Sequence, residues 1–172
     1  MRARYPYRPG WAQAAAFLIS LLCGSAAWGQ SKTWDGAAGG GDWHTGSNWD
    51  PDGVPGSGDT VYNTESGCVI TISADATCAV LQFHPGTQLT IATACVLTVT
   101  ASSAAVFQCN GATLATTGTG LISVTGGVAS GEMFQGTMTI GNFVWNDPSG
   151  NSMYVRANNT VTCSGSFTIT KG

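Results

Sequence analysis

Short triplets of the form apolar-polar-apolar recur along the chain from about residue 60 onward, separated by Gly, Ser, Thr, Asn and Ala. Such alternation places one face of a β-strand toward a core and the other toward solvent. The pattern therefore predicts strands at nine positions: Ile70-Thr71-Ile72, Leu81-Gln82-Phe83, Leu89-Thr90-Ile91, Leu97-Thr98-Val99, Ile122-Ser123-Val124, Met138-Thr139-Ile140, Phe143-Val144-Trp145, Met153-Tyr154-Val155 and Phe167-Thr168-Ile169.

The spacing of these triplets favours a solenoid. The first four begin at residues 70, 81, 89 and 97, and Val106 and Leu114 continue a step of about eight residues. Three such steps give a coil of roughly 24 residues, which suits one turn of a three-faced parallel β-helix. A sandwich of antiparallel hairpins is less favoured, because only Asn110-Gly111 is a strong hairpin signal. We predict an all-β chain that forms a right-handed parallel β-helix.

The first 29 residues have the layout of a secretory signal peptide: three arginines, an apolar run over residues 14–22, and small residues up to Gly29. The apolar run is shorter than the roughly 20 residues of a membrane span. We therefore expect export, with residues 1–29 as signal peptide, 30–61 as an N-terminal cap and 62–172 as β-solenoid coils. No membrane span is expected in the mature segment.

Charge excludes nucleic acid as an expected partner. Past residue 29 the basic residues are Lys32, Arg156 and Lys171, whereas all nine acidic residues remain. Binding to phosphates requires clustered Lys and Arg side chains, which this acidic segment lacks.

Residues 33–61 are rich in Trp, Asp and Gly and come just before the first predicted coil. Their order and spacing resemble the opening of secreted bacterial β-helical surface proteins, including those with autotransporter-associated β-strand repeats. The resemblance is carried by Trp34, Gly41-Asp42-Trp43, Asn48-Trp49, Pro51, Val54-Pro55 and Asp59-Thr60-Val61.

This resemblance implies a structural or adhesin-like role, outside the cell or at its surface, and supplies no common catalytic residues. It also implies a longer protein, often with a C-terminal membrane barrel or sorting signal. The sequence ends within a strand pattern at Gly172. We expect a truncated gene, a fragment, or a small relative that caps itself by association.

The three tryptophans of the segment have two interpretations. Indole rings can stack on sugars, so Trp34, Trp43 and Trp49 are candidate ligand-binding residues of a carbohydrate-binding module. An aromatic segment directly before a solenoid is better explained by covering the apolar end of its first coil. We favour the cap.

Asp50, Asp52 and Asp59 flank the loop "PDGVPGSG", and oxygen-rich loops can hold calcium. The spacing matches neither an EF-hand loop nor the calcium-binding nonapeptide repeat. Aspartates that bond to nearby backbone amides in turns are the preferred explanation. We expect no cofactor.

Five cysteines follow the signal segment, and Cys68 and Cys78 are the closest pair in sequence. Export permits disulfides, so Cys68–Cys78 is the candidate bridge. The alternative is that several of these cysteines are small buried core residues.

A polysaccharide lyase or hydrolase fragment is a further alternative, since such enzymes also use parallel β-helices. Hydrolysis requires two carboxylates about 5 to 10 Å apart, but the charged residues beyond residue 61 are scattered over different predicted coils. The two histidines also lack evident partners. We therefore predict a non-enzymatic protein whose partners are surface glycans, host or matrix components, or a second copy bound through the C-terminal strand edge.

Overall fold

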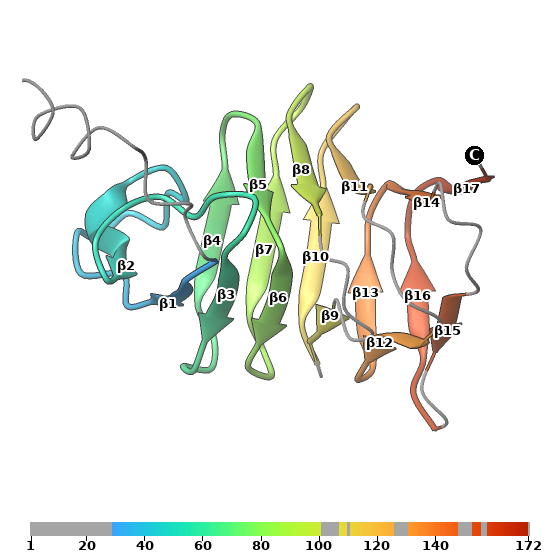
Figure 1. Cartoon of the computed structure of the whole chain (residues 1–172), viewed down its shortest axis with the longest axis horizontal. Coiled ribbons are helices and arrows are strands. Elements are labelled where there is room, and N and C mark those ends of the chain that lie inside the picture. Colours follow the sequence, from blue (N-terminus) through green and yellow to red (C-terminus); the bar gives the residue numbers. More distant parts are fainter. Residues whose placement is uncertain are drawn as a thin grey trace, which may run out of the picture.

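The computed structural model describes residues 29–100, 107–109, 111–125, 131–147, 153–155 and 158–171. Strands follow one another in sets of three, and successive sets stack along the long axis of the molecule (Figure 1). Each set contributes one strand to each of three parallel sheets, here named A, B and C. This arrangement confirms the predicted parallel β-helix.

Each of the three sheets contains five strands that belong to the coils. Sheet A contains β3 (Thr60–Asn63), β6 (Val80–Phe83), β9 (Phe107–Gln108), β12 (Gly131–Gln135) and β15 (Met153–Val155). Sheet B contains β4 (Val69–Ile72), β7 (Gln88–Ile91), β10 (Thr113–Thr116), β13 (Met138–Ile140) and β16 (Val161–Cys163). Sheet C contains β5 (Ala76–Cys78), β8 (Val96–Val99), β11 (Leu121–Val124), β14 (Phe143–Asp147) and β17 (Phe167–Lys171).

Two further strands, β1 (Ser31–Trp34) and β2 (Trp49–Asp50), extend sheet A at its N-terminal edge. The only helical element of the described residues is the 3-10 turn η1 (Gly46–Asn48). Among these residues no helix has the length and apolar character needed to cross a membrane.

All nine predicted triplets lie within strands of the structure. In the seven triplets from Ile70-Thr71-Ile72 to Phe143-Val144-Trp145, the two flanking apolar residues are buried and the more exposed middle residue points outward. The flanking residues form columns along the interior. In sheet B one such column consists of Ile70, Leu89, Leu114 and Ile140, which are in register and fully buried. Each buried aliphatic side chain contributes about 1.5–3 kcal/mol relative to exposure, so these columns hold the stack together.

Coil length varies around the predicted value of roughly 24 residues, while the strands keep their register except for one shift between β12 and β15. Ile70 pairs with Leu89, 19 residues later, whereas Phe107 pairs with Phe134, 27 residues later. The connections at the corners absorb this difference. Gly111 illustrates such a corner: with φ 73° it lies between β9 of sheet A and β10 of sheet B. The hairpin signal at Asn110-Gly111 thus falls on a solenoid corner, with Asn110 itself outside the described residues.

Candidate functional site

The three tryptophans of the cap form one buried cluster. Trp34 is 5% exposed, and Trp43 and Trp49 are fully buried. The Trp49 ring meets both others edge to face, with centroid distances of 5.0 Å to Trp34 and 4.8 Å to Trp43. Its Nε1 donates a hydrogen bond to the Trp43 carbonyl oxygen at 2.8 Å. Because protein covers these indole faces, they cannot stack on an external sugar, and their burial agrees with the capping interpretation.

The cap covers strand edges as well as side chains. β1 pairs in parallel with β3 and antiparallel with β2, so that sheet A continues into the cap. At the edge of sheet B, Trp43 N donates to Thr71 O and Thr71 N donates to Gly41 O. A Cβ on Gly41 would lie 2.7 Å from the Val69 carbonyl oxygen, so this approach requires glycine. The N-terminal edges of both sheets are therefore hydrogen-bonded to the cap.

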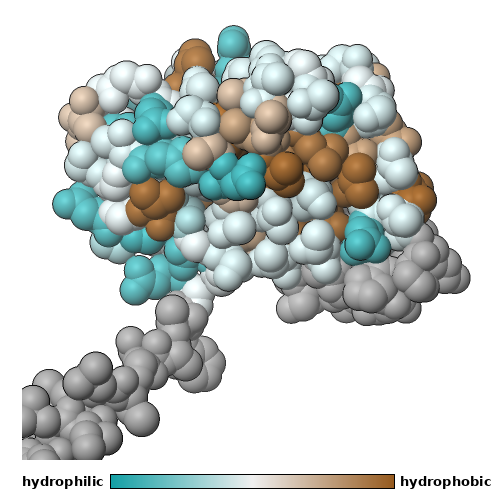
Figure 2. Space-filling model, turned by 90° about the horizontal axis from the view of Figure 1, so that it is seen from above, coloured by the Kyte–Doolittle hydropathy of each residue, from teal (hydrophilic) through white to brown (hydrophobic). Residues whose placement is uncertain are grey.

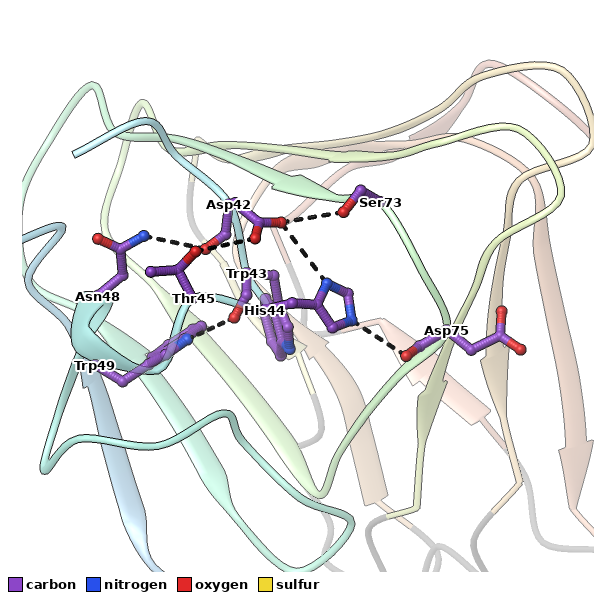
Figure 3. A network of polar contacts seen from close by, with 8 residues as sticks. All are labelled: Asp42, Trp43, His44, Thr45, Asn48, Trp49, Ser73 and Asp75. Carbon is purple, nitrogen blue, oxygen red and sulfur yellow. Dashed lines mark hydrogen bonds and ion pairs between the residues drawn. The ribbon is translucent and has the colours of Figure 1, made fainter. Parts of the chain in front are cut away.

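Asp42 is the centre of a polar network that ties the cap to the first coil (Figure 3). Its carboxylate accepts hydrogen bonds from the Thr45 hydroxyl within the cap and from the Ser73 hydroxyl beyond β4, both at 3.1 Å. His44 Nδ1 lies 3.7 Å from Asp42 Oδ1, and His44 Nε2 lies 3.2 Å from the Asp75 carbonyl oxygen. The network thus spans the junction between cap and coil.

The network contains Ser, His and Asp but is not connected as a nucleophilic triad. In a triad the histidine contacts the serine hydroxyl and an aspartate orients the histidine. Here Ser73 donates to Asp42, and the far nitrogen of His44 is engaged by a backbone carbonyl. The connectivity suits a structural clamp. The sequence prediction that the histidines lack partners is wrong for His44.

The Asp42 carboxyl has a lowered pKa. Desolvation raises the pKa, but hydrogen bonds from the Thr45 hydroxyl, the His44 backbone and the Ser73 hydroxyl lower it more, and the charge of His44 adds to this lowering. The net pKa falls below the ordinary value of 3.8. The ionised carboxylate is therefore the form that stabilises the junction.

We expect Asp42→Asn to destabilise the protein above pH 4 and to remove part of its acid sensitivity. A group whose folded pKa is depressed stabilises the fold above its unfolded pKa, and this contribution is lost as pH falls through the folded pKa. The Asp42 side chain is 40% exposed, so solvent screening keeps the effect to about 1 kcal/mol or less. Urea unfolding between pH 7 and pH 2.5 measures it. Glu65→Gln, at an exposed position, is the control. If both variants lost the same free energy of unfolding, the stabilising role given to the ionised Asp42 carboxylate would be contradicted.

The three aspartates of the candidate calcium loop are not brought together. Asp59 accepts backbone hydrogen bonds from Gln30 N at 2.7 Å and Gly56 N at 2.8 Å, as expected for a turn former. Asp50 lies exposed on β2, and Asp52 contributes its carbonyl oxygen to the Lys32 ammonium. Across the described residues no group of three acidic, His or Cys side chains is placed to hold a metal ion.

A lysine supplies the positive charge in this loop. Lys32 is 6% exposed, and its Nζ donates to Pro51 O at 2.8 Å and Asp52 O at 3.1 Å. Sequence reasoning did not single out Lys32, because lysine is rarely buried. The alternation in Ser31-Lys32-Thr33-Trp34 was the available signal, since it places Lys32 on the buried face with Trp34.

We expect Lys32→Met to lower the free energy of unfolding by about 1–3 kcal/mol, because two part-buried hydrogen bonds from a charged donor to carbonyl oxygens are lost. Urea unfolding measures this change. Calcium should raise the thermal midpoint of neither the native protein nor the variant. A calcium-dependent rise in the native protein would instead support a metal site at Asp50, Asp52 and Asp59.

The described cysteines are all free thiols, so the candidate disulfide between Cys68 and Cys78 is not formed in the structure. Cys68 lies just before β4, whereas Cys78 ends β5 and is fully buried. Burial raises the pKa of the Cys78 thiol, with smaller contributions from Cys109 and Asp59. Burial also raises the pKa of the Cys109 thiol to about 12. Both thiols remain protonated at neutral pH and act as small core residues.

The fold and the cap together define a parallel β-solenoid whose N-terminal end is closed by a tryptophan cluster. No protein family, curated protein or solved structure matches the chain. The resemblance to bacterial β-helical surface proteins therefore remains a prediction that depends on the motif residues of the cap.

Proposed function

We propose that the protein is a non-enzymatic structural or adhesin-like β-solenoid that acts outside the cell or at its surface. The observation that carries this proposal is the presence of outward-facing columns of uncharged polar side chains in register. Thr77, Thr98 and Ser123 form such a column on sheet C, and Thr113 and Thr139 form one on sheet B. Much of the face seen in Figure 2 is pale, which is the colour of near-neutral hydropathy, although brown apolar residues and teal hydrophilic residues also lie on it.

Such columns suit contact with an extended surface. Neighbouring strands of a sheet lie about 4.8 Å apart, so each column repeats a hydroxyl or amide group at a fixed interval. Single hydrogen bonds of this kind are weak, but several made together raise the overall affinity without any strong individual contact. With charged residues only 9% of the chain, these faces favour polar, uncharged partners such as surface glycans or matrix components.

A carbohydrate-binding module is the second candidate, and one column favours it. On the outer face of sheet A, Tyr62, Gln82, Gln108 and Gln135 are in register and half-buried. Amides both donate and accept hydrogen bonds, as sugar hydroxyls do, and an aromatic ring can pack against a sugar face. This column is a better candidate than the buried tryptophans of the cap.

Binding to insoluble polysaccharides and to immobilised matrix proteins tests both candidates. The variant Gln82→Ala/Gln108→Ala/Gln135→Ala removes the amides of sheet A, and Thr77→Val/Thr98→Val is the matched change on sheet C. Carbohydrate recognition predicts a loss of polysaccharide affinity of about tenfold or more, roughly 1.4 kcal/mol, in the first variant only. Binding to matrix proteins that both variants weaken supports a broader adhesive surface. Release of soluble sugar products would overturn the non-enzymatic proposal.

A further inference from the structure

The outer face of sheet C carries a regular array of short side chains. Its five strands pair in register without a shift. The outward residues that these pairings align form one straight column, which consists of Thr77, Thr98, Ser123, Val144 and Thr168. Thr100 N donates to Cys78 O, which extends the sheet by one more residue. A second outward column therefore lies two positions further along the strands and consists of Thr100, Thr125, Asn146 and Thr170.

The hydroxyl groups of this array are available to an external partner. Six of them make no side-chain hydrogen bond within the described part of the chain: those of Thr77, Thr98, Ser123, Thr125, Thr168 and Thr170. Thr100 is the exception, because the backbone carbonyls of Ser57 and Cys78 engage its hydroxyl. At the corner between sheets B and C, by contrast, the Thr117 hydroxyl is held by Ile91 O. The array thus presents rows of donors and acceptors that the described fold does not itself use.

Both columns are short, stiff and uncharged. Thr and Val are β-branched, so their χ1 torsions are restricted and their methyl and hydroxyl groups keep fixed positions. Neither column contains a Lys, Arg, Asp or Glu side chain. The other sheets are less even, since longer side chains point outward from them: Tyr62 and Gln82 from sheet A, and Gln88 from sheet B. Because no charge has to be desolvated, the face of sheet C complements an uncharged partner.

We propose that this face of sheet C binds ice. Neighbouring strands lie about 4.8 Å apart and alternate residues of one strand about 6.6 Å apart, so the two columns repeat their groups in two directions. Surfaces of ice repeat their oxygen atoms in two directions at similar intervals. Hydroxyl groups can donate to and accept from this lattice, and contact releases the first-shell water around the methyl groups of Thr and Val.

Binding of this kind depends on the number and spacing of the contacts. Liquid water competes for each hydroxyl, so a single hydrogen bond contributes little net free energy. Groups held at fixed intervals on a rigid sheet pay little ordering cost on binding, and their weak contributions combine. Ice is a partner beyond the glycans and matrix components proposed above, and its binding does not depend on theirs.

Thermal hysteresis, the gap between the melting and freezing temperatures of a single ice crystal, tests ice binding by the purified protein. We expect the native protein to open a gap that grows with concentration. Thr98→Tyr/Ser123→Tyr places two bulky rings on adjacent coils of sheet C and should abolish the gap, because the lattice can no longer approach the columns. Thr113→Tyr/Thr139→Tyr is the matched control, since these two residues are also in register and half-buried but lie on the outer face of sheet B.

Ice binding by sheet C is rejected if the native protein opens no gap, or if both double variants reduce the gap equally. Circular dichroism verifies that each variant remains folded. Binding to polysaccharides or matrix proteins without thermal hysteresis would keep the adhesin-like role and reject ice binding. Thermal hysteresis without such binding would support ice binding and reject the adhesin-like role.

Discussion

Trp49→Ala is expected to lower the free energy of unfolding by about 3–5 kcal/mol, the usual cost of truncating a buried aromatic side chain. Trp49 is fully buried and packs between Trp34 and Trp43. Its loss opens a cavity at the junction of cap and first coil and removes the hydrogen bond to the Trp43 carbonyl. Urea unfolding followed by far-ultraviolet circular dichroism measures the change.

The control for this experiment is Val54→Ala, in the same segment but 42% exposed. We expect it to change the stability by no more than about 0.5 kcal/mol. Equal unfolding midpoints for Trp49→Ala and the native protein would contradict the capping role and would return the tryptophans to consideration as a ligand site.

Phe134→Ala is expected to cost a similar amount, about 3–5 kcal/mol, for a different reason. Phe134 is 1% exposed on β12, between β9 and β15 of sheet A, where its ring lies 5.2 Å from Phe107 and 5.7 Å from Phe143. In a solenoid each coil contacts only its neighbours, so loss of an internal contact uncouples the coils on its two sides. Thermal unfolding should then become broader or separate into two transitions.

Phe167→Ala is the matched change in β17, the last described strand. Phe167 is 40% exposed, and among the described aromatic rings it contacts only Phe143, so its truncation should lower the free energy of unfolding by less than half as much. If Phe134→Ala and Phe167→Ala lowered the free energy of unfolding equally, the greater burial of Phe134 would not determine its contribution to stability.

Strands could be predicted where both flanks of a triplet are strongly apolar. β5, β12 and β16 escaped prediction because Ala76-Thr77-Cys78, Val161-Thr162-Cys163 and the segment from Gly131 offer weaker contrast. These strands form because hydrogen-bonded neighbours already exist on adjacent coils. Pairing with these neighbours is a tertiary effect, so it cannot be predicted from the local pattern of apolar and polar residues.

The cap was predictable in kind but not in its connections. The order of tryptophans and glycines before the first coil indicated a cover, and the rings are buried. The contacts of Asp42 with Ser73 and of His44 with Asp75 each join residues 31 positions apart. A single sequence does not show which residues so far apart along the chain come into contact. Lys32 was missed because lysine is rarely buried, although the alternation of residues 31–34 places it on the buried face of β1.

The uneven length of the coils has a consequence for tolerance to change. Apart from one register shift between β12 and β15, the interior columns keep their register although the paired residues lie between 19 and 27 positions apart. Loop-closure entropy rises only slowly with length, so extra residues at a corner cost little. A peptide inserted at a corner should therefore be displayed beside the stack without displacing any core position, and the protein offers a scaffold for placing epitopes at regular intervals.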